Sequence, residues 1–512
     1  MEKNFINTCF MVSNRKVWME LSKTMLCAGF QPVMWIGDPA HTKDVEKNYP
    51  DCTVYDLRAF NKAETLKRPD NKHALPLFVL QDQGFYKLKD QVLKMMDRQD
   101  DHGSFRRLER EALFYAMVTY FYSEIKKHDL DFVLSAEGPH SPSQMIIYKL
   151  CEIMGIQRIH FMTSNIAPFL LMRTSVENAD VLPIDDQGRD LSMLKALVRD
   201  YVYGFRDDGQ PMAEPLYIKL QRDKEQAAKL SKSTGFLSAP VKRMKSIAKR
   251  YLRNKRGDDW RSSTIKSLNF LDESLTADRN DVQARKTYTR KIHKMLRDEY
   301  DAVTVPWERG KPYVYFPLHY EPERTTNPDG GAFYQTYDTL MALRDMVPNE
   351  IPIYIKEHYS QFSSAMKGYR GKSHYFYRSL KALPNIYVLK SEESSGELIR
   401  GALLTASITG TPALEAACMG KKALIFGHTW FSNCPNIYSF DPHLGYEDIL
   451  SAPVHDKQAI TAFFDGLIDG FAVRGCINQS NDAYYTKKLG QENADMLLQD
   501  GEMISDIMRG LR

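Results

Sequence analysis

Several features that assign proteins to common classes are missing from this chain. Its 512 residues hold no run of about 18 apolar residues, so no transmembrane helix is expected. The seven cysteines form no CxxC pair and no Cys/His cluster, which argues against a disulfide framework or a zinc site and fits reduced thiols. The first residues, Met-Glu-Lys-Asn, lack the basic-then-apolar order of a signal peptide. We therefore expect a cytoplasmic protein.

The chain also carries little net charge. A formal charge of +4 is too small for this length to suggest a nucleic-acid binder. With 43% hydrophobic and 26% charged residues, the composition is that of a globular protein of two or three domains. The sequence shows no clustered His and Asp ligand set, so no metal is expected. No cofactor is expected either.

One stretch is strongly basic. Residues 241–256 contain many lysines and arginines and no acid, while apolar side chains recur at helical spacing. This pattern predicts a basic amphipathic helix, which would contact an anionic membrane surface at the inner face of the plasma membrane. Two alternatives stay open. The helix packs its apolar stripe on its own domain, or the segment contacts RNA.

The first part of the chain alternates strand and helix, which predicts a doubly wound α/β domain. A long helix over Phe105–Lys127 carries an apolar stripe expected in the core, made of Leu108, Leu113, Tyr115, Met117 and Phe121. The other predicted elements are strands at Phe5–Val12, Pro32–Ile36, Thr53–Leu57, Phe132–Ser135 and Arg158–Met162, with helices at Arg15–Ala28 and Gln144–Met154.

A second α/β unit follows a charged, helix-rich stretch. Its predicted strands are Tyr313–Phe316, Ile351–Ile355, Ile386–Val388, Leu403–Ile408 and Ala423–Phe426. We expect four segments: a Rossmann-like domain (1–175), a helical connector (176–305), a second Rossmann-like domain (306–450), and C-terminal helices that cross back to the first domain (451–512).

Three motifs stand at the ends of predicted strands of the second unit. They are the segment from Leu318 to Glu323, Lys356-Glu357-His358, and the segment from Thr409 to Ala416. The third predicts a tight Gly turn, a Thr N-cap and Pro412 at the first helical position, so that free backbone N–H groups face an anion. Because parallel strands place their carboxyl ends at one edge, the three motifs together predict a nucleotide phosphate pocket. Taken singly, each has a structural explanation: a capped helix, a strand-end histidine and a solvated loop.

In the first unit the singular residue is Glu137. It follows a strand and precedes Gly138 and a Pro-containing turn, which would hold a carboxylate at the rim of the sheet as a base or nucleophile. His140 would orient it or contact the substrate. The alternative is that Glu137 caps the helix that begins near Ser141.

These stretches resemble the C-terminal half of bacterial capsule polysaccharide biosynthesis proteins. Those are similar to GT-B glycosyltransferases, among them the capsular Kdo transferases. The resemblance covers Lys311 to Trp430, and upstream it includes the segment from Ser135 to His140. It rests on the stretches Tyr313 to Glu323, Pro328 to Gly331, Ile355 to His358, Asn385 to Val388, Glu397 to Ile399, Ile408 to Ala416 and Gly420 to Gly427.

The resemblance implies a GT-B-like fold, with two Rossmann-type domains facing a cleft, and a metal-independent glycosyltransferase. Its catalytic residues would be Glu137 and His358, with His140 on the acceptor side. Tyr359 stands where the family has a proline after the histidine, and Ala136 where it has a first acid. The implied donor-binding residues are His319, Glu321, Glu323, Lys356, Glu357, Thr409, Gly410, Thr411 and Glu415, the last for the ribose.

The substrates that the resemblance implies are a nucleotide sugar, such as CMP-Kdo or a related CMP-sugar, and a capsule or lipopolysaccharide glycan or glycolipid as acceptor. Other activities stay open at this stage. A nucleotide-sugar epimerase of the same fold would use the same phosphate pocket. A teichoic-acid-type glycerophosphotransferase would move a phosphodiester, and a binding protein would turn over nothing.

Overall fold

The computed structural model describes residues 5–12, 17–37, 42–56, 75–98, 106–185, 188–205, 279–358, 360–363, 367–477, 479–490 and 492–511. The basic segment 241–256 lies outside these ranges, so the helix expected there stays a prediction. Within them, no helix combines the length and apolarity that crossing a membrane requires.

The first half of the chain builds a seven-stranded sheet. Five of its strands are parallel, and the two at one edge run antiparallel to their neighbours. In spatial order the strands are β14 (Ala472–Arg474), β6 (Phe169–Arg173), β5 (Gln157–Thr163), β4 (Phe132–Ser135), β1 (Ile6–Met11), β2 (Phe30–Gly37) and β3 (Thr53–Asp56).

Helices cover both faces of this sheet, which explains why its central strands are apolar along most of their length. One face packs against α5 (Gln83–Met95), α6 (Arg107–Lys127) and α7 (Pro142–Ile153), and the other against α1 (Val17–Cys27). The stripe predicted on α6 is partly wrong. Leu113, Met117 and Phe121 are buried, but Leu108 is 76% and Tyr115 40% exposed, because only one side of α6 meets α5 and α7.

The second domain is an all-parallel seven-stranded sheet. Its spatial order is β13 (Ile437–Ser439), β12 (Ala423–Ile425), β11 (Leu404–Ser407), β8 (Val314–Pro317), β9 (Ile353–Lys356), β10 (Ile386–Leu389) and β7 (Thr304–Val305). The predicted strands of both domains are confirmed, with ends that differ by one or two residues. The sequence patterns missed β6, β7, β13 and β14, which are short or lie at or near sheet edges.

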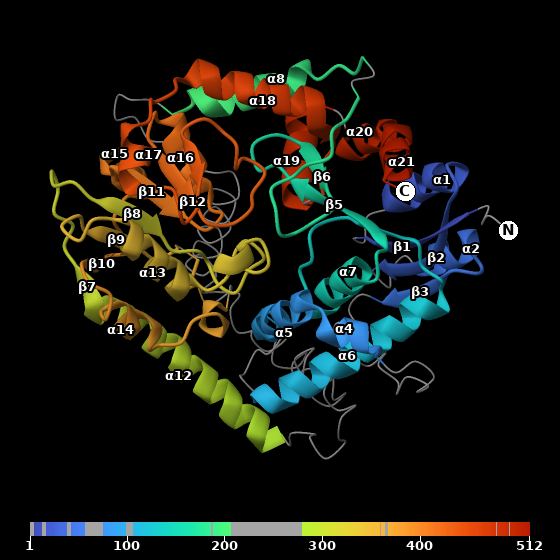
Figure 1. The fold of residues 1–512 in the computed structure, drawn as a ribbon, viewed down its shortest axis with the longest axis horizontal. Helices are drawn as coiled ribbons and strands as arrows, with labels where there is room; N and C mark the ends of the chain where they lie inside the picture. The colour runs from blue at the N-terminus through green and yellow to red at the C-terminus, as the bar shows by residue number, and fades with distance from the viewer. Residues whose placement is uncertain are drawn as a thin grey trace, which may run out of the picture.

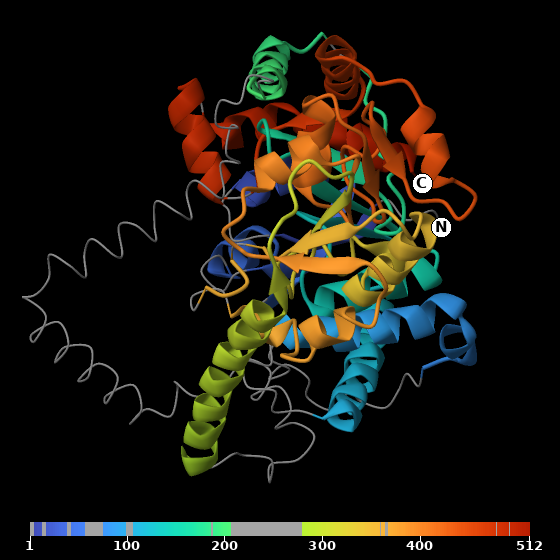
Figure 2. The ribbon, with the colours of Figure 1, turned by 90° about the vertical axis from the view of Figure 1, so that its left-hand side faces the viewer.

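The segment expected to be a connector contributes to the second domain. The long helix α12 (Arg279–Val303) buries Leu296, Tyr300 and Val303 against β8 and β9 and leads directly into β7. Figure 2 shows α12 extending beyond the body of the second domain. At its other end the connector supplies α8 (Ser192–Tyr203), which packs on α18 (Lys457–Phe471).

The end of the chain returns to the first domain. After α18, strand β14 pairs with β6, and α20 (Asn493–Gln499) and α21 (Gly501–Gly510) pack on α1 (Figure 1). Asp500 fixes this return, because its carboxylate accepts hydrogen bonds from the main chain and the guanidinium of Arg474 and from Arg189. The architecture is therefore two Rossmann-type domains in a GT-B-like arrangement, joined by helices that cross between them.

Candidate active site between the two domains

The strand order confirms that the three predicted motifs of the second domain lie at one edge. β8 is flanked by β11 and β9, so the residues that follow these strands are neighbours at the carboxyl edge of the sheet. His319 follows β8, His358 follows β9 and Thr409 follows β11. This adjacency makes the edge a single surface rather than three separate loops.

His319 joins two of these strand ends. Its Nε2 lies 3.1 Å from the Ser407 hydroxyl and accepts a hydrogen bond of 3.3 Å from the backbone N–H of Thr409. Burial, followed by the nearby His358 and Lys372, lowers the pKa of His319 to about 3, so the ring is neutral. His319 therefore shapes the turn after β11 and lies mostly buried beneath it.

The predicted N-cap of the helix after β11 is wrong. Helix α16 (Thr411–Cys418) has Gly410 at its N-cap position and Thr411 as its first residue. The backbone N–H groups of Thr409 and Gly410 bond to His319 and Ser407, and Pro412 has no N–H. Two N–H groups at the turn that leads into the helix are thus satisfied internally, which leaves fewer free N–H groups for an anion than predicted.

The side chains of this turn are also engaged. The Thr409 hydroxyl donates to the carbonyl of Thr325, and the Thr411 hydroxyl donates to Glu415 over 3.4 Å. Burial raises the pKa of Glu415 to about 7, with the Thr411 hydrogen bond opposing. The phosphate and ribose contacts expected of Thr409, Gly410, Thr411 and Glu415 stay predictions, and Glu415 is a group that titrates near neutrality.

Glu357 lies in a buried network instead of facing the opening. Its side chain has no exposed area, and its two oxygens lie 2.8 and 2.9 Å from the Lys372 amine. The Tyr377 hydroxyl and the backbone N–H of His358 also donate to it. Lys372 donates as well to the carbonyl of His319, at 2.9 Å. The expected donor-binding role does not fit this placement, which instead makes Glu357 an internal tie between the ends of β8 and β9.

His358 presents a defined hydrogen-bond donor. The backbone N–H of Ser360 donates to its Nδ1 at 3.1 Å, so Nδ1 carries no proton and the neutral ring has its proton on Nε2. Burial, followed by the cations Lys372 and Lys356, lowers the pKa of His358 to about 4. Lys356 is itself buried, and its pKa falls to about 8 despite the opposing charges of Glu393 and Glu357. An N–H donor and a lysine side by side suit an anionic oxygen.

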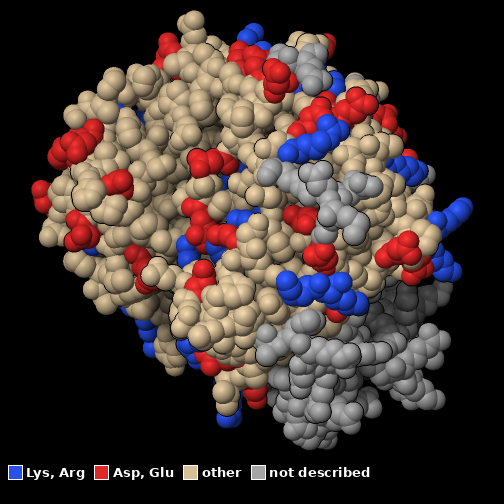
Figure 3. Space-filling model, turned by 45° about the vertical axis from the view of Figure 1, so that its right-hand side comes forward, with Lys and Arg blue, Asp and Glu red and all other residues tan. Residues whose placement is uncertain are grey.

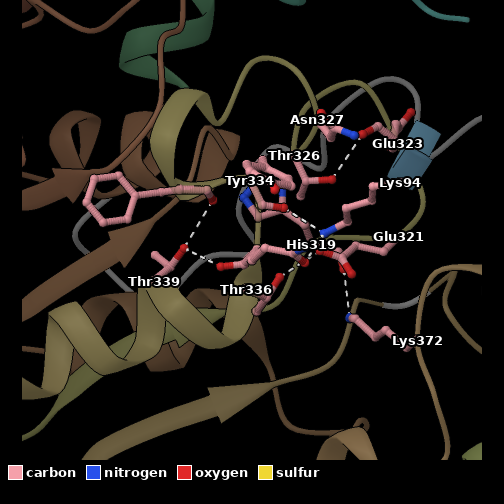
Figure 4. Close-up of polar contacts among 12 residues, drawn as sticks. Lys94, His319, Glu321, Glu323, Thr326, Asn327, Tyr334, Thr336, Thr339 and Lys372 are labelled. Carbon is pink, nitrogen blue, oxygen red and sulfur yellow. Dashed lines mark hydrogen bonds and ion pairs between the residues drawn. The ribbon is translucent and has the colours of Figure 1, made fainter. Parts of the chain in front are cut away.

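The segment after β8 reaches the first domain. Glu321 is buried, accepts a hydrogen bond of 2.7 Å from Thr336, and lies 3.9 Å from the amine of Lys94 in α5 (Figure 4). Lys94 also donates to the carbonyl of Tyr334 at 2.7 Å. Burial raises the pKa of Glu323, against the charges of Arg324 and Arg98. Glu321 therefore acts in the contact between domains, and Glu323 is an acid within a group of arginines.

Glu137 and His140 form the wall that the first domain contributes, where Arg324 of the second domain lies against Gly138. Oε1 of Glu137 lies 3.3 Å from Nδ1 of His140, and the side chains are 41% and 42% exposed. The pKa of Glu137 is raised by surrounding protein, with Arg324 opposing. The pKa of His140 is lowered to about 3 by the same surroundings and then by Arg324 and Arg98. Figure 3 shows a hollow on one face of the molecule in which acidic and basic side chains gather.

Glu137 does not cap the following helix. Ser141 is the N-cap of α7, and its backbone N–H bonds the side chain of Gln144 in a reciprocal capping box. The hydroxyl of Ser135 donates to the carbonyl of Glu137 at 2.7 Å. The turn that carries Glu137 and His140 is therefore held by its own hydrogen bonds, and the two side chains are left for the hollow.

Sequence reasoning missed a group of arginines between the two walls. Arg324 pairs with Asp329 at 2.9 Å, and its guanidinium lies against Gly138, where a Cβ would meet it at 3.2 Å. Arg98 donates to the carbonyl of His140 at 2.8 Å and to that of Asn327, and Arg370 donates to the carbonyl of Arg98. Arg324 follows the predicted Glu323 directly and could have been included on that ground. Arg98 comes from a different domain, and no local pattern marks it.

An Asp-x-Asp pair is present in the chain at Asp129 and Asp131. It lies at the amino end of β4, where Asp131 accepts a hydrogen bond of 3.0 Å from the backbone of Asn7. Glu137 follows the other end of the same strand, so this pair is not part of the hollow. Among the described residues, no group of three or more His, Cys, Asp or Glu side chains is placed to hold a metal ion.

Comparisons with known proteins add only distant structural similarity. No protein-family model and no curated protein sequence matches this chain. Among solved structures, KpsC of Thermosulfurimonas dismutans, a beta Kdo 2,7 transferase, is 16% identical over 34% of this chain and 50% of its own, with a TM-score of 0.22. The KpsC beta Kdo 2,4 transferase is 11% identical over 65% and 78% of the two chains, with a TM-score of 0.26. UDP-GlcNAc 2-epimerase of Neisseria meningitidis is 11% identical over 99% and 100%, with a TM-score of 0.19. The fold assignment rests on the two sheets themselves.

The geometry defines what the hollow is able to do. One wall offers a neutral N–H donor and a lysine beside each other, which suits a phosphate oxygen. The other wall offers a carboxylate beside a neutral imidazole, which suits the transfer of a proton. Arginines connect the two walls and add positive charge.

Proposed function

We propose that this protein is a glycosyltransferase that moves a sugar from a nucleotide-sugar donor to a glycan acceptor. The observation that carries the proposal is the pairing of Glu137 with His140 in the first domain, where Arg324 of the second domain lies against Gly138. His358 and Lys356 lie at the carboxyl edge of the second sheet. Transfer of a sugar needs a group that takes the acceptor proton and donors that stabilise the departing phosphate. The two walls supply one each.

The proposal includes the substrates that the sequence resemblance implies. The donor is CMP-Kdo or a related CMP-sugar, and the acceptor is a growing capsule or lipopolysaccharide glycan, lipid-linked in its natural form. His358 contacts the leaving phosphate through Nε2–H, and no metal or cofactor takes part. Segment 241–256, with its many basic side chains, brings the enzyme to the anionic inner face of the plasma membrane.

A two-step experiment tests this proposal. Thermal shifts with CMP, UDP, GDP and CDP identify the nucleotide, since a ligand at 100 times its dissociation constant adds about 2.7 kcal/mol to the free energy of unfolding. The corresponding sugar nucleotides are then incubated with and without a short soluble acceptor glycan. Product that forms only with acceptor supports the proposal. Epimerised donor without acceptor, phosphodiester transfer, or binding with no turnover contradicts it and favours an epimerase, a glycerophosphotransferase or a binding protein.

A further inference from the structure

The ring of His140 is held in one tautomer by two acceptors. Its Nδ1 lies 3.3 Å from Oε1 of Glu137 and also 3.3 Å from the carbonyl oxygen of Gly138. A carbonyl oxygen only accepts hydrogen bonds, so Nδ1 of the neutral ring must carry the proton. The lone pair is then on Nε2, and among the described residues nothing bonds to that atom.

The backbone of His140 is fixed independently of Glu137. Its N–H donates to the side chain of Gln144 at 3.0 Å, and its carbonyl accepts from Arg98 at 2.8 Å. The next residue, Ser141, is the N-cap of α7 and is followed by Pro142. The ring is therefore anchored on its main-chain side, and 42% of its side chain is exposed.

Four charged groups surround the ring and determine how easily it takes a proton. Glu137 faces it from its own turn, Arg98 from the segment after α5, and Arg324 and Asp329 from the second domain. Burial and the two arginines disfavour the imidazolium, which makes the resting ring a weak base. The carboxylate of Glu137 is in position to stabilise the cation at the moment it forms.

We propose that His140 is the general base of the reaction and that Glu137 is its positioning residue. In the proposed transfer, on which this inference rests, the acceptor hydroxyl gives its proton to Nε2 of His140. Its oxygen forms the bond to the anomeric carbon, and the bond from that carbon to the phosphate oxygen breaks with its electron pair leaving on the nucleotide. The imidazolium, offset by Glu137, then releases its proton to water.

This assignment differs from one in which Glu137 is itself the base or the nucleophile. If Glu137 only positions the ring, Glu137→Gln keeps much of the rate, because the Gly138 carbonyl still fixes the Nδ1–H tautomer. If Glu137 reacts directly, Glu137→Gln removes the reacting atom and His140→Ala does not. The two assignments therefore predict opposite orders of activity for Glu137→Gln and His140→Ala.

Chemical rescue separates the two roles. With CMP-Kdo and UDP-N-acetylglucosamine as donor probes and a short soluble glycan as acceptor, His140→Ala should lose at least about 100-fold in kcat, as expected for loss of a general base. Added imidazole should restore part of it. Glu137→Gln should lose less, and formate should not restore Glu137→Ala. His455→Ala, an exposed histidine that meets Asn436 through its main chain only, is the matched control.

The outcomes distinguish this inference from the proposed function. No turnover by the unaltered protein would overturn both. Turnover with a His140→Ala rate within threefold of normal, or rescue of Glu137→Ala by formate without rescue of His140→Ala by imidazole, would overturn only the role of His140. A readout without substrate is the ¹⁵N-histidine spectrum, in which the signals lost in His140→Ala should show a protonated Nδ1 and a bare Nε2. The reverse tautomer would also overturn the assignment.

Discussion

The amine of Lys94 in the first domain lies 3.9 Å from the carboxylate of Glu321 in the second. The same amine donates to the carbonyl of Tyr334 and to the side chain of Gln335, at 2.7 and 2.8 Å. Burial lowers the pKa of Lys94, while Glu321 opposes that shift. Lys94 thus connects helix α5 to the segment that carries Glu323 and Arg324. This contact fixes the position of the first domain relative to the second.

Lys94→Ala should loosen this tie. We expect the free energy of unfolding to fall by about 1.5–3 kcal/mol, the range for hydrogen bonds to a charged group, and small-angle scattering to show a more open molecule. Lys89→Ala is the matched control, because Lys89 also lies on α5 and 3.9 Å from an acid, Glu111, within the first domain. Equal effects of the two substitutions would show that Lys94 does not govern the relation between domains.

His358→Ala should impair the donor side. We expect turnover to fall by about 100-fold or more, comparable to the loss of one preorganised oxyanion donor, with an unchanged circular dichroism spectrum. The reason is that Nε2–H of His358 is fixed as a donor by the bond that Ser360 makes to Nδ1. A normal rate in this variant, measured beside His455→Ala, would remove His358 from the mechanism.

Glu357→Gln should lower stability rather than nucleotide affinity. Removing one partner of its buried ion pair with Lys372 leaves a buried charge, which costs about 3–5 kcal/mol. In urea unfolding, the double variant Glu357→Gln/Lys372→Met should lose less than the sum of the single variants. A loss of nucleotide binding without a loss of stability would return Glu357 to the donor site.

Glu415 should make stability depend on pH. Its pKa in the folded protein, about 7, lies above the ordinary value of 4.5, so the folded state binds more protons between these values and stability falls as pH rises through that window. Glu415→Gln removes the dependence. As the pH rises from 5 to 8, we expect the free energy of unfolding of this variant to increase by about 1–3 kcal/mol relative to that of the unaltered protein. Parallel pH curves for the two proteins would contradict the raised pKa.

Segment 241–256, outside the described residues, gives a separate prediction. Replacing Lys245, Lys249, Arg250 and Arg253 with Gln should weaken binding to anionic vesicles by about 1 kcal/mol per residue near the surface, less at high salt. Activity on a short soluble acceptor should not change. Vesicle sedimentation measures the effect, and equal binding of both forms would favour a packed or RNA-contacting segment.

The sequence predicted the carboxyl edge of the second sheet well, because hydrophobic runs locate strand ends and parallel strands share an edge. It failed where partners come from distant segments. Glu357 looked like a rim residue, but Lys372 and Tyr377 enclose it. Thr411 looked like an N-cap, but His319 and Ser407 shape that turn so that Gly410 takes the position. Arg98 meets Asn327 across the domain boundary, and no local pattern reports such a contact.

The return of the chain to the first domain has a consequence for synthesis on the ribosome. Leu497, Met503, Ile504 and Met508 fill the core that α1 and the first sheet share. Until those residues have been made, α1 exposes an apolar face and β6 lacks its edge partner, long after the strands beside them have emerged. The first domain therefore stays incomplete and prone to aggregation while the second domain is translated and folds. A chaperone that shields this face should raise the yield of the whole protein more than that of the second domain alone.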